Sequence, residues 1–234
     1  HRMTPRDTTR SSTSPRIWPN QSTTPWKKHR QRFSMRQIER MPEDAWRPCK
    51  AHYYGNTNVI DDGIGAFLEV LESRGMLENT VVVYASDHGE MLFDHGLHGK
   101  QQMYEASAGV PLICRWPERF RRNAEIDAHV SLLDLVPTFL ELAETGLQEL
   151  HGVSLLPALT RGDAPDRDAV FSEMRDTKMI RQGDWKYVYN PEWERPQLFN
   201  LDKDPLELQN LADKSDHAAV QADLHQRILE WMIE

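Results

Sequence analysis

The stretch Thr80-Val81-Val82-Val83-Tyr84-Ala85-Ser86-Asp87-His88-Gly89-Glu90 indicates the fold class and contains the candidate site. Four of its first six residues are β-branched, which is typical of a buried strand in a parallel sheet. Asp87 and His88 follow this strand directly. Ligands of open α/β sheets bind at the carboxyl ends of the strands. The sequence therefore predicts an α/β fold with these two side chains at the rim of its sheet.

The residue types at this rim can ligate a metal ion. Asp87 offers a carboxylate oxygen and His88 an imidazole nitrogen. Oxygen ligands suit Ca²⁺ or Mg²⁺, and an imidazole favours Mn²⁺ or another transition ion. Gly89 would let the backbone approach the ion closely. Two adjacent ligands do not fill a coordination sphere, so an equally simple interpretation is a turn-capping Asp87 beside a partly exposed His88.

Two further features lie close behind this pair. Asp94-His95-Gly96 repeats the tripeptide seven residues later. Asp94 and His95 either form a turn or orient the metal ligands by hydrogen bonds. Lys100 is either a surface lysine or a cation that stabilises an oxyanion on the metal.

Composition limits the classes of function. A chain of 234 residues suffices for one large or two modest domains. The net charge of −8 argues against nucleic acid as the main partner. The sequence holds no apolar run near the roughly 20 residues of a membrane span. Cys49 and Cys114 form neither a disulfide framework nor a zinc pattern.

The chain divides into three parts on composition and pattern. Residues 1–50 are predicted as an irregular basic arm or linker, 51–165 as part of an α/β core, and 166–234 as a small α+β subdomain. Within residues 1–32, eight Lys and Arg stand against one acidic residue, which favours a solvated linker; an out-of-frame stretch or a basic tail would have the same composition. Because the chain starts at His1, we interpret it as a fragment, and the sequence assigns no compartment.

Local patterns predict several elements. An apolar stripe at three- and four-residue spacing predicts a helix from Tyr53 that ends at Gly75. The subdomain is predicted to contain a closing helix over residues 220–232. Short buried strands are predicted at residues 110–114, 169–171, 179–181, 185–189 and 197–201.

Taken together, the motifs resemble the C-terminal half of the sulfatase family, within the alkaline phosphatase superfamily. The resemblance covers about residues 50 to 215. It is carried by these ordered segments: Asp61-Asp62-Gly63-Ile64-Gly65, Ser86 to Leu92, Asp94-His95-Gly96, Gly99-Lys100, Tyr104 to Ser107, Val110 to Ile113, His129-Val130-Ser131 with Asp134 to Thr138, His151 to Pro157, and Leu198 to Leu201 with Asp204-Pro205, Glu207, Asn210 and Leu211.

This resemblance implies a partial doubly wound alkaline-phosphatase-like core with a small C-terminal α+β subdomain. It implies hydrolysis of small-molecule sulfate esters at one divalent cation, with Ca²⁺ favoured over Mn²⁺ or Mg²⁺. By position, Asp87 and His88 would be metal ligands and Lys100 would contact the sulfate. Many sulfatases carry Asn after the Asp, and the Asp-His form resembles the branch with phosphonate monoester and phosphodiester hydrolases and choline sulfatase-like enzymes.

The nucleophile of the family is not found in this sequence. Sulfatases use a formylglycine made within a Cys-x-Pro-Ser-Arg type motif, and neither Cys49 nor Cys114 lies in one. We therefore expect the formylglycine in a missing N-terminal part and no appreciable sulfatase activity from this chain alone. The alternatives are a fragment of a phosphonate monoester or phosphodiester hydrolase and a non-catalytic module that binds an anion or a metal.

Overall fold

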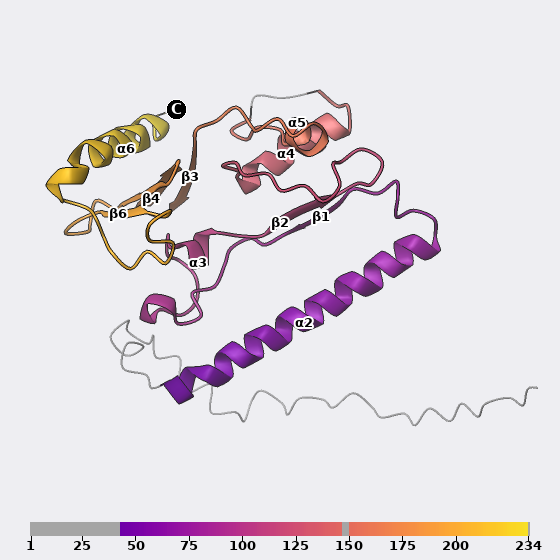
Figure 1. Cartoon of the computed structure of the whole chain (residues 1–234), viewed down its shortest axis with the longest axis horizontal. Helices are drawn as coiled ribbons and strands as arrows, with labels where there is room; N and C mark the ends of the chain where they lie inside the picture. Colours follow the sequence, from indigo (N-terminus) through magenta and orange to yellow (C-terminus); the bar gives the residue numbers. More distant parts are fainter. Residues whose placement is uncertain (1–42, 147–149, 234) are drawn as a thin grey trace, which may run out of the picture.

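The computed structural model describes residues 43–146 and 150–233 (Figure 1). Its first element is the helix α2, Glu43–Ser73. The helix ends as predicted at Gly75, which has φ +66°. The Gly75 N–H donates to the Glu72 carbonyl at 2.9 Å and the Met76 N–H to the Leu71 carbonyl at 2.9 Å. These two bonds are the Schellman ending that a glycine in the left-handed region permits.

The beginning of α2 corrects the sequence prediction. The helix starts at Glu43 rather than Tyr53, so residues 43–50 of the predicted irregular arm are helical; the rest of that arm, residues 1–42, lies outside the described residues. Pro48 lies in the helix, and a proline there suggests a helix end rather than a continuation. The apolar periodicity therefore did not predict the first ten residues of α2.

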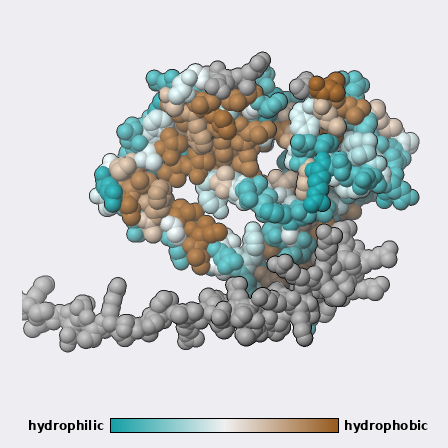
Figure 2. Space-filling model, turned by 180° about the vertical axis from the view of Figure 1, so that it is seen from behind, coloured by the Kyte–Doolittle hydropathy of each residue, from teal (hydrophilic) through white to brown (hydrophobic). Residues whose placement is uncertain are grey.

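The apolar stripe of α2 is only partly buried. Leu71 is buried, whereas Val59, Ile60 and Phe67 are exposed. An amphipathic face is buried only where another element packs against it. In the described part of the chain, no element packs against much of the apolar face of α2. Figure 2 shows hydrophobic side chains gathered on the surface of the molecule.

The strand after α2 is present, but its pairing differs from the prediction. β1, Val82–Ala85, pairs antiparallel with β2, Leu112–Arg115, and Val83 lies opposite Cys114. Both strands are partly rather than fully buried. The prediction of a parallel partner was wrong for this pair, because a run of β-branched residues indicates a strand and says nothing about the direction of its neighbour.

Short helices lie beside this ribbon. The segment from β1 to β2 contains η2, Asp94–Gly96, and α3, Glu105–Ala108. After β2 come η3, Leu132–Asp134, then α4, Leu135–Leu142, and α5, Leu156–Thr160. Figure 1 shows α2 on one side of the β1–β2 ribbon and α4 with α5 on the other.

The C-terminal residues form an antiparallel sheet with one covering helix. The sheet joins β3 (Ala169–Met174), β4 (Thr177–Gln182), β5 (Trp185–Tyr189) and β6 (Gln197–Asn200) in that order. Helix α6, Ala218–Trp231, packs on β4 and β5. Their core includes Ile180, Leu198, Leu224 and Ile228. The predicted strands and closing helix of this region are confirmed as these elements. Within residues 43–146 and 150–233, no helix is long and apolar enough to cross a membrane.

Candidate functional site

The turn after β1 presents Asp87 and His88 side by side. The Ser86 hydroxyl donates to the His88 carbonyl at 2.8 Å, and Asp87 Oδ1 accepts the His88 N–H at 3.0 Å. These bonds tighten the turn directly after the last residue of the strand. The Asp87 side chain is 83% exposed and the His88 side chain 35%, so both are accessible to a ligand.

The imidazole of His88 is held in one tautomer. Its Nδ1 lies 2.7 Å from the Gly89 carbonyl oxygen, and since a carbonyl only accepts, Nδ1 carries the proton. Nε2 lies 2.6 Å from Lys100 Nζ, and since an ammonium only donates, Nε2 accepts in this contact; it also lies 3.4 Å from Asp87 Oδ2. A backbone carbonyl that fixes the far nitrogen of a histidine is a typical arrangement around metal-ligating imidazoles. The structure thus brings together Asp87, His88 and Lys100, as the sequence predicted.

Gly89 packs closely against α3. Its N–H donates to the Ser107 carbonyl at 2.8 Å. A Cβ at this position would lie 2.1 Å from the Ala106 carbonyl oxygen. Glycine is therefore required because the backbone of α3 packs directly against it.

Glu90 holds both ends of the loop between it and Gly99, which places Lys100 beside His88. Its Oε1 accepts the Gly99 N–H at 2.5 Å and the Leu92 N–H at 3.3 Å. Gly99 itself has φ +86°, which suits glycine. Sequence reasoning gave Glu90 no function, although its place beside the Asp-His pair and nine residues before Gly99 was visible.

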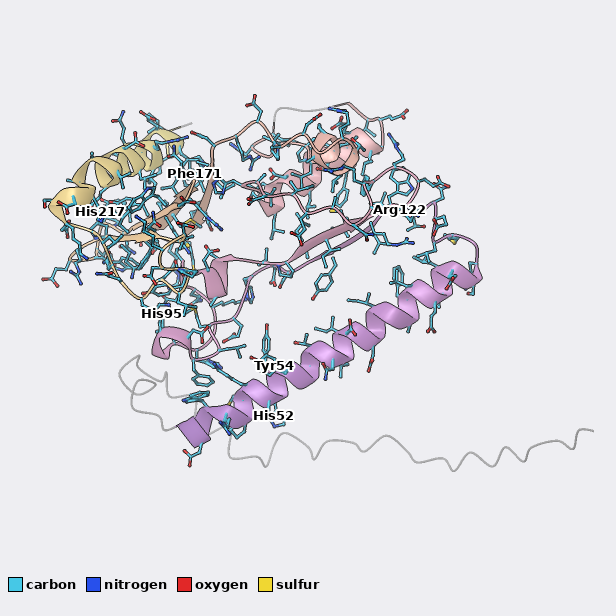
Figure 3. The ribbon with its side chains drawn as sticks, viewed as in Figure 1. His52, Tyr54, His95, Arg122, Phe171 and His217 are labelled. Carbon is cyan, nitrogen blue, oxygen red and sulfur yellow. The ribbon has the colours of Figure 1, made fainter. Side chains whose placement is uncertain are left out.

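The side chains of the second tripeptide, Asp94-His95-Gly96, contact residues outside the Asp87–His88–Lys100 group. Asp94 pairs with Lys50 on α2 at 3.6 Å. The ring of His95 stacks on Tyr104 with 3.9 Å between centroids, and Figure 3 shows His95 on the loop near α3. Among the described residues, neither side chain bonds to Asp87 or His88, and these contacts favour the first of the two alternatives, in which Asp94 and His95 form a turn.

The donor chemistry fits part of a divalent metal site. Asp87 supplies carboxylate oxygen, and His88 Nε2 has a lone pair beside it. In residues 43–146 and 150–233, no group of three or more His, Cys, Asp and Glu side chains could hold a metal ion. A complete coordination sphere therefore needs ligands in addition to this pair.

A cleft of about 1370 Å³ extends from Asp87 to β3, β4 and α6. Burial lowers the pKa of His129 in its lining, and the positive charge of Arg181 lowers it further. His129 is thereby kept neutral over a wider pH range than an exposed histidine. Other polar residues in the lining include His151, Arg167, Glu173, Lys178 and Arg181.

The sequence of residues 17–145 matches the family described as Sulfatase. The chain belongs to the sulfatase family. A second match, described as N-sulphoglucosamine sulphohydrolase, C-terminal, covers residues 93–234. The first match begins inside residues 1–32, for which a linker or an out-of-frame stretch was predicted, so residues 17–32 align with the sulfatases.

Two curated relatives illustrate how much of a sulfatase the chain spans. Arylsulfatase K of Rattus norvegicus is 36% identical in a 186-residue alignment that covers 73% of this chain and 33% of that protein. Choline-sulfatase of Rhizobium meliloti (strain 1021) is 33% identical in a 210-residue alignment that covers 82% of this chain and 39% of that protein. The chain spans less than half the length of either relative.

Solved structures agree on the fold. A putative sulfatase from Bacteroides thetaiotaomicron superposes with a TM-score of 0.75 and 28% identity over 85% of this chain and 46% of that one. Phosphonate monoester hydrolase of Agrobacterium radiobacter superposes with a TM-score of 0.69 and 29% identity over 77% of this chain and 40% of that one. The predicted α/β class, a C-terminal part of the alkaline-phosphatase-like fold, is confirmed.

Proposed function

We propose that this chain supplies one half of a divalent-metal active site that hydrolyses small-molecule sulfate esters. The observation that carries the proposal is the convergence of Asp87, His88 and Lys100 after β1. Lys100 Nζ lies 2.6 Å from His88 Nε2. Family membership and the similarity to arylsulfatase K and choline-sulfatase support sulfate esters as substrates.

Each of the three side chains has a distinct proposed contribution. The Asp87 carboxylate and the Nε2 lone pair of His88 would hold the cation, for which the resemblance to the sulfatases favours Ca²⁺ over Mn²⁺ or Mg²⁺. When bound, the cation polarises the sulfuryl oxygens as a Lewis acid. The Lys100 ammonium would contact the sulfate and stabilise the negative charge that develops on its oxygens.

The chain lacks a recognisable nucleophile of the family. Neither Cys49 nor Cys114 is followed by the residues of a formylglycine motif. We propose that the formylglycine comes from residues outside these 234, and that the chain alone has no appreciable activity.

The alternative is a phosphonate monoester or phosphodiester hydrolase. Two observations support it: histidine follows Asp87, and the chain superposes on phosphonate monoester hydrolase with a TM-score of 0.69. The metal half-site and Lys100 would have the same contributions, and the ester would differ.

Metal binding tests the proposal directly. Isothermal titration of the purified chain with Ca²⁺ and Mn²⁺ is expected to detect binding that Asp87→Asn and His88→Gln both abolish. Asp94→Asn is the matched control, because Asp94 is an aspartate before a histidine on the same loop and pairs only with Lys50 among the described residues. Equal loss of binding in Asp94→Asn, or unchanged binding in Asp87→Asn, would contradict the assignment.

Hydrolysis assays separate the candidate reactions. The chain alone is expected to turn over neither an aryl sulfate nor an aryl phosphonate monoester. Measurable aryl sulfate turnover would refute the need for an external nucleophile, and turnover confined to the phosphonate would favour the alternative. Metal binding without turnover of either ester, even in a longer form that carries a formylglycine motif, would favour a non-catalytic module.

A further inference from the structure

Four charged side chains meet between α3 and the C-terminal sheet. Lys186 on β5 is fully buried, and its Nζ lies 2.9 Å from Glu105 Oε1 and 2.8 Å from Glu207 Oε1. Glu207 is also buried. Arg181 on β4 pairs with Glu105 Oε2 at 3.1 Å. Two carboxylates thus balance two cations, which offsets the desolvation that burial of Lys186 and Glu207 entails.

The cluster fixes the start of α3 as well as balancing charge. Glu105 is the first residue of that helix, and its N–H donates to Glu207 Oε2 at 2.6 Å. Its carboxylate accepts from Lys186 and Arg181 at the same time. Both the backbone and the side chain of Glu105 are therefore anchored to residues more than seventy positions away in the sequence.

A short series of hydrogen bonds leads from α3 to the ligand pair. The Ser107 carbonyl of α3 accepts the Gly89 N–H at 2.8 Å. The Gly89 carbonyl in turn accepts Nδ1–H of His88 at 2.7 Å. There is no slack at this contact, since a Cβ on Gly89 would lie 2.1 Å from the Ala106 oxygen. A displacement of α3 must displace Gly89 and with it the imidazole.

We infer that Glu105, Lys186 and Glu207 are positioning residues, through which the C-terminal sheet sets the orientation of His88 for metal binding. This inference rests on the metal half-site proposed above. None of the three touches Asp87, His88 or Lys100 among the described residues, so they act through α3 and Gly89.

Apolar packing already holds the segment around α3 against the C-terminal sheet, so the charged cluster is not needed for that attachment. Met103, two residues before α3, packs with Met179 of β4 and Val188 of β5. Such contacts are non-directional, whereas hydrogen bonds to charged groups have defined directions and lengths. The charged cluster therefore adds direction to an interface that is already held by apolar contacts.

Amide hydrogen exchange of the whole chain, followed by NMR, tests the inference. The variants are Glu207→Gln and Glu105→Gln, which keep the side-chain shape and remove one charge. The second is the safer variant, because Glu105 is about one-third exposed (32%) and its loss leaves Lys186 paired with Glu207. The control is Glu173→Gln, which removes the ion pair with Lys178 on the same sheet and leaves α3 untouched.

We expect the Gly89 amide to exchange about tenfold faster in both cluster variants, with β3–β6 amides within about twofold of wild type. Mn²⁺ affinity should fall by about 10–100-fold, as for other residues that orient a metal ligand. The control should leave both quantities unchanged.

Two results would overturn the inference. One is an unchanged Gly89 exchange rate in a folded Glu105→Gln variant. The other is a rise shared equally by the β3–β6 amides, which would reduce the cluster to a general contribution to stability. If the wild-type chain binds no Mn²⁺, the proposed metal half-site fails, and the Gly89 exchange rates still decide whether the cluster positions the His88 loop.

Discussion

Replacement of Gly89 by alanine gives the sharpest test of how the candidate site is built. The added Cβ would lie 2.1 Å from the Ala106 oxygen, 2.9 Å from the Ala106 carbonyl carbon and 3.2 Å from the Gly109 oxygen. All three atoms belong to the backbone, so no side-chain rotation relieves the clash. The turn after β1 and α3 must therefore separate by at least about 1.3 Å for this Cβ to reach ordinary contact distance from the Ala106 oxygen.

The free energy of unfolding should fall by about 2 kcal/mol. Overpacking of this kind costs about 1–3 kcal/mol, and the separation weakens the Gly89–Ser107 hydrogen bond, worth about 1 kcal/mol. The reduced freedom of the unfolded chain returns about 0.4–1 kcal/mol. The clash outweighs this gain because it falls on rigid backbone.

Urea unfolding followed by far-UV circular dichroism measures the change, with Gly63→Ala as the control. Gly63 lies in α2 with nothing within 4 Å of its added Cβ, so this substitution should stabilise the helix by about 0.5–1 kcal/mol. Opposite signs for the two substitutions are expected. A Gly89→Ala variant as stable as wild type would refute the close approach of α3 to the metal-ligand turn.

Three further perturbations follow from the structure. Asp134→Ala should lower the free energy of unfolding by about 3–5 kcal/mol, because it leaves the mostly buried Arg167, 2.6 Å from the lost carboxylate, without this partner. Burial raises the pKa of Tyr187 to about 12, whereas a tyrosine in the unfolded chain ionises near 10. The free energy of unfolding should therefore fall by about 2 kcal/mol between pH 10 and 12, and by less in Tyr187→Phe. Arg227 lowers the pKa of the exposed Asp168, so Asp168→Asn should cost at most about 1 kcal/mol at neutral pH, a difference that vanishes as acid protonates the folded carboxyl.

Urea unfolding across pH measures all three effects. A loss under about 1 kcal/mol for Asp134→Ala would contradict its buried pairing. For Tyr187, equal alkaline slopes in wild type and Tyr187→Phe would show that another group titrates. A pH-independent difference for Asp168→Asn would assign its effect to packing rather than charge.

Local patterns were enough to predict most elements of this fold. The strand ending at Ala85, the four strands of the C-terminal sheet and α6 were found from periodicity and turn residues, because those signals act between neighbours in the sequence. Helix α2 shows where this approach fails. Its start at Glu43 lies before Pro48, and half of its apolar stripe (Val59, Ile60 and Phe67) remains exposed, since burial depends on a partner that the pattern does not specify.

The repeated tripeptide shows the same distinction within the site. Asp87-His88-Gly89 and Asp94-His95-Gly96 are identical in sequence. The first follows β1 and meets Lys100, whereas the second bends through η2, where His95 has φ +54° and stacks on Tyr104. Only Asp87-His88-Gly89 closely follows a predicted strand. That strand, rather than the tripeptide itself, indicated Asp87 and His88 as the candidate site.

The sequence by itself determined family membership, the secondary structure of the C-terminal region and the choice of Asp87, His88 and Lys100 as candidate site residues. Each of these depends on residue types at short, fixed spacing. Tertiary structure alone decided the antiparallel partner of β1 and the contact of Gly89 with α3. It also decided the ion pairs of Glu105 with Lys186, 81 positions away, and its backbone bond to Glu207, 102 positions away. Charges so far apart in the chain become partners only when packing excludes water around them, and no local pattern encodes that exclusion.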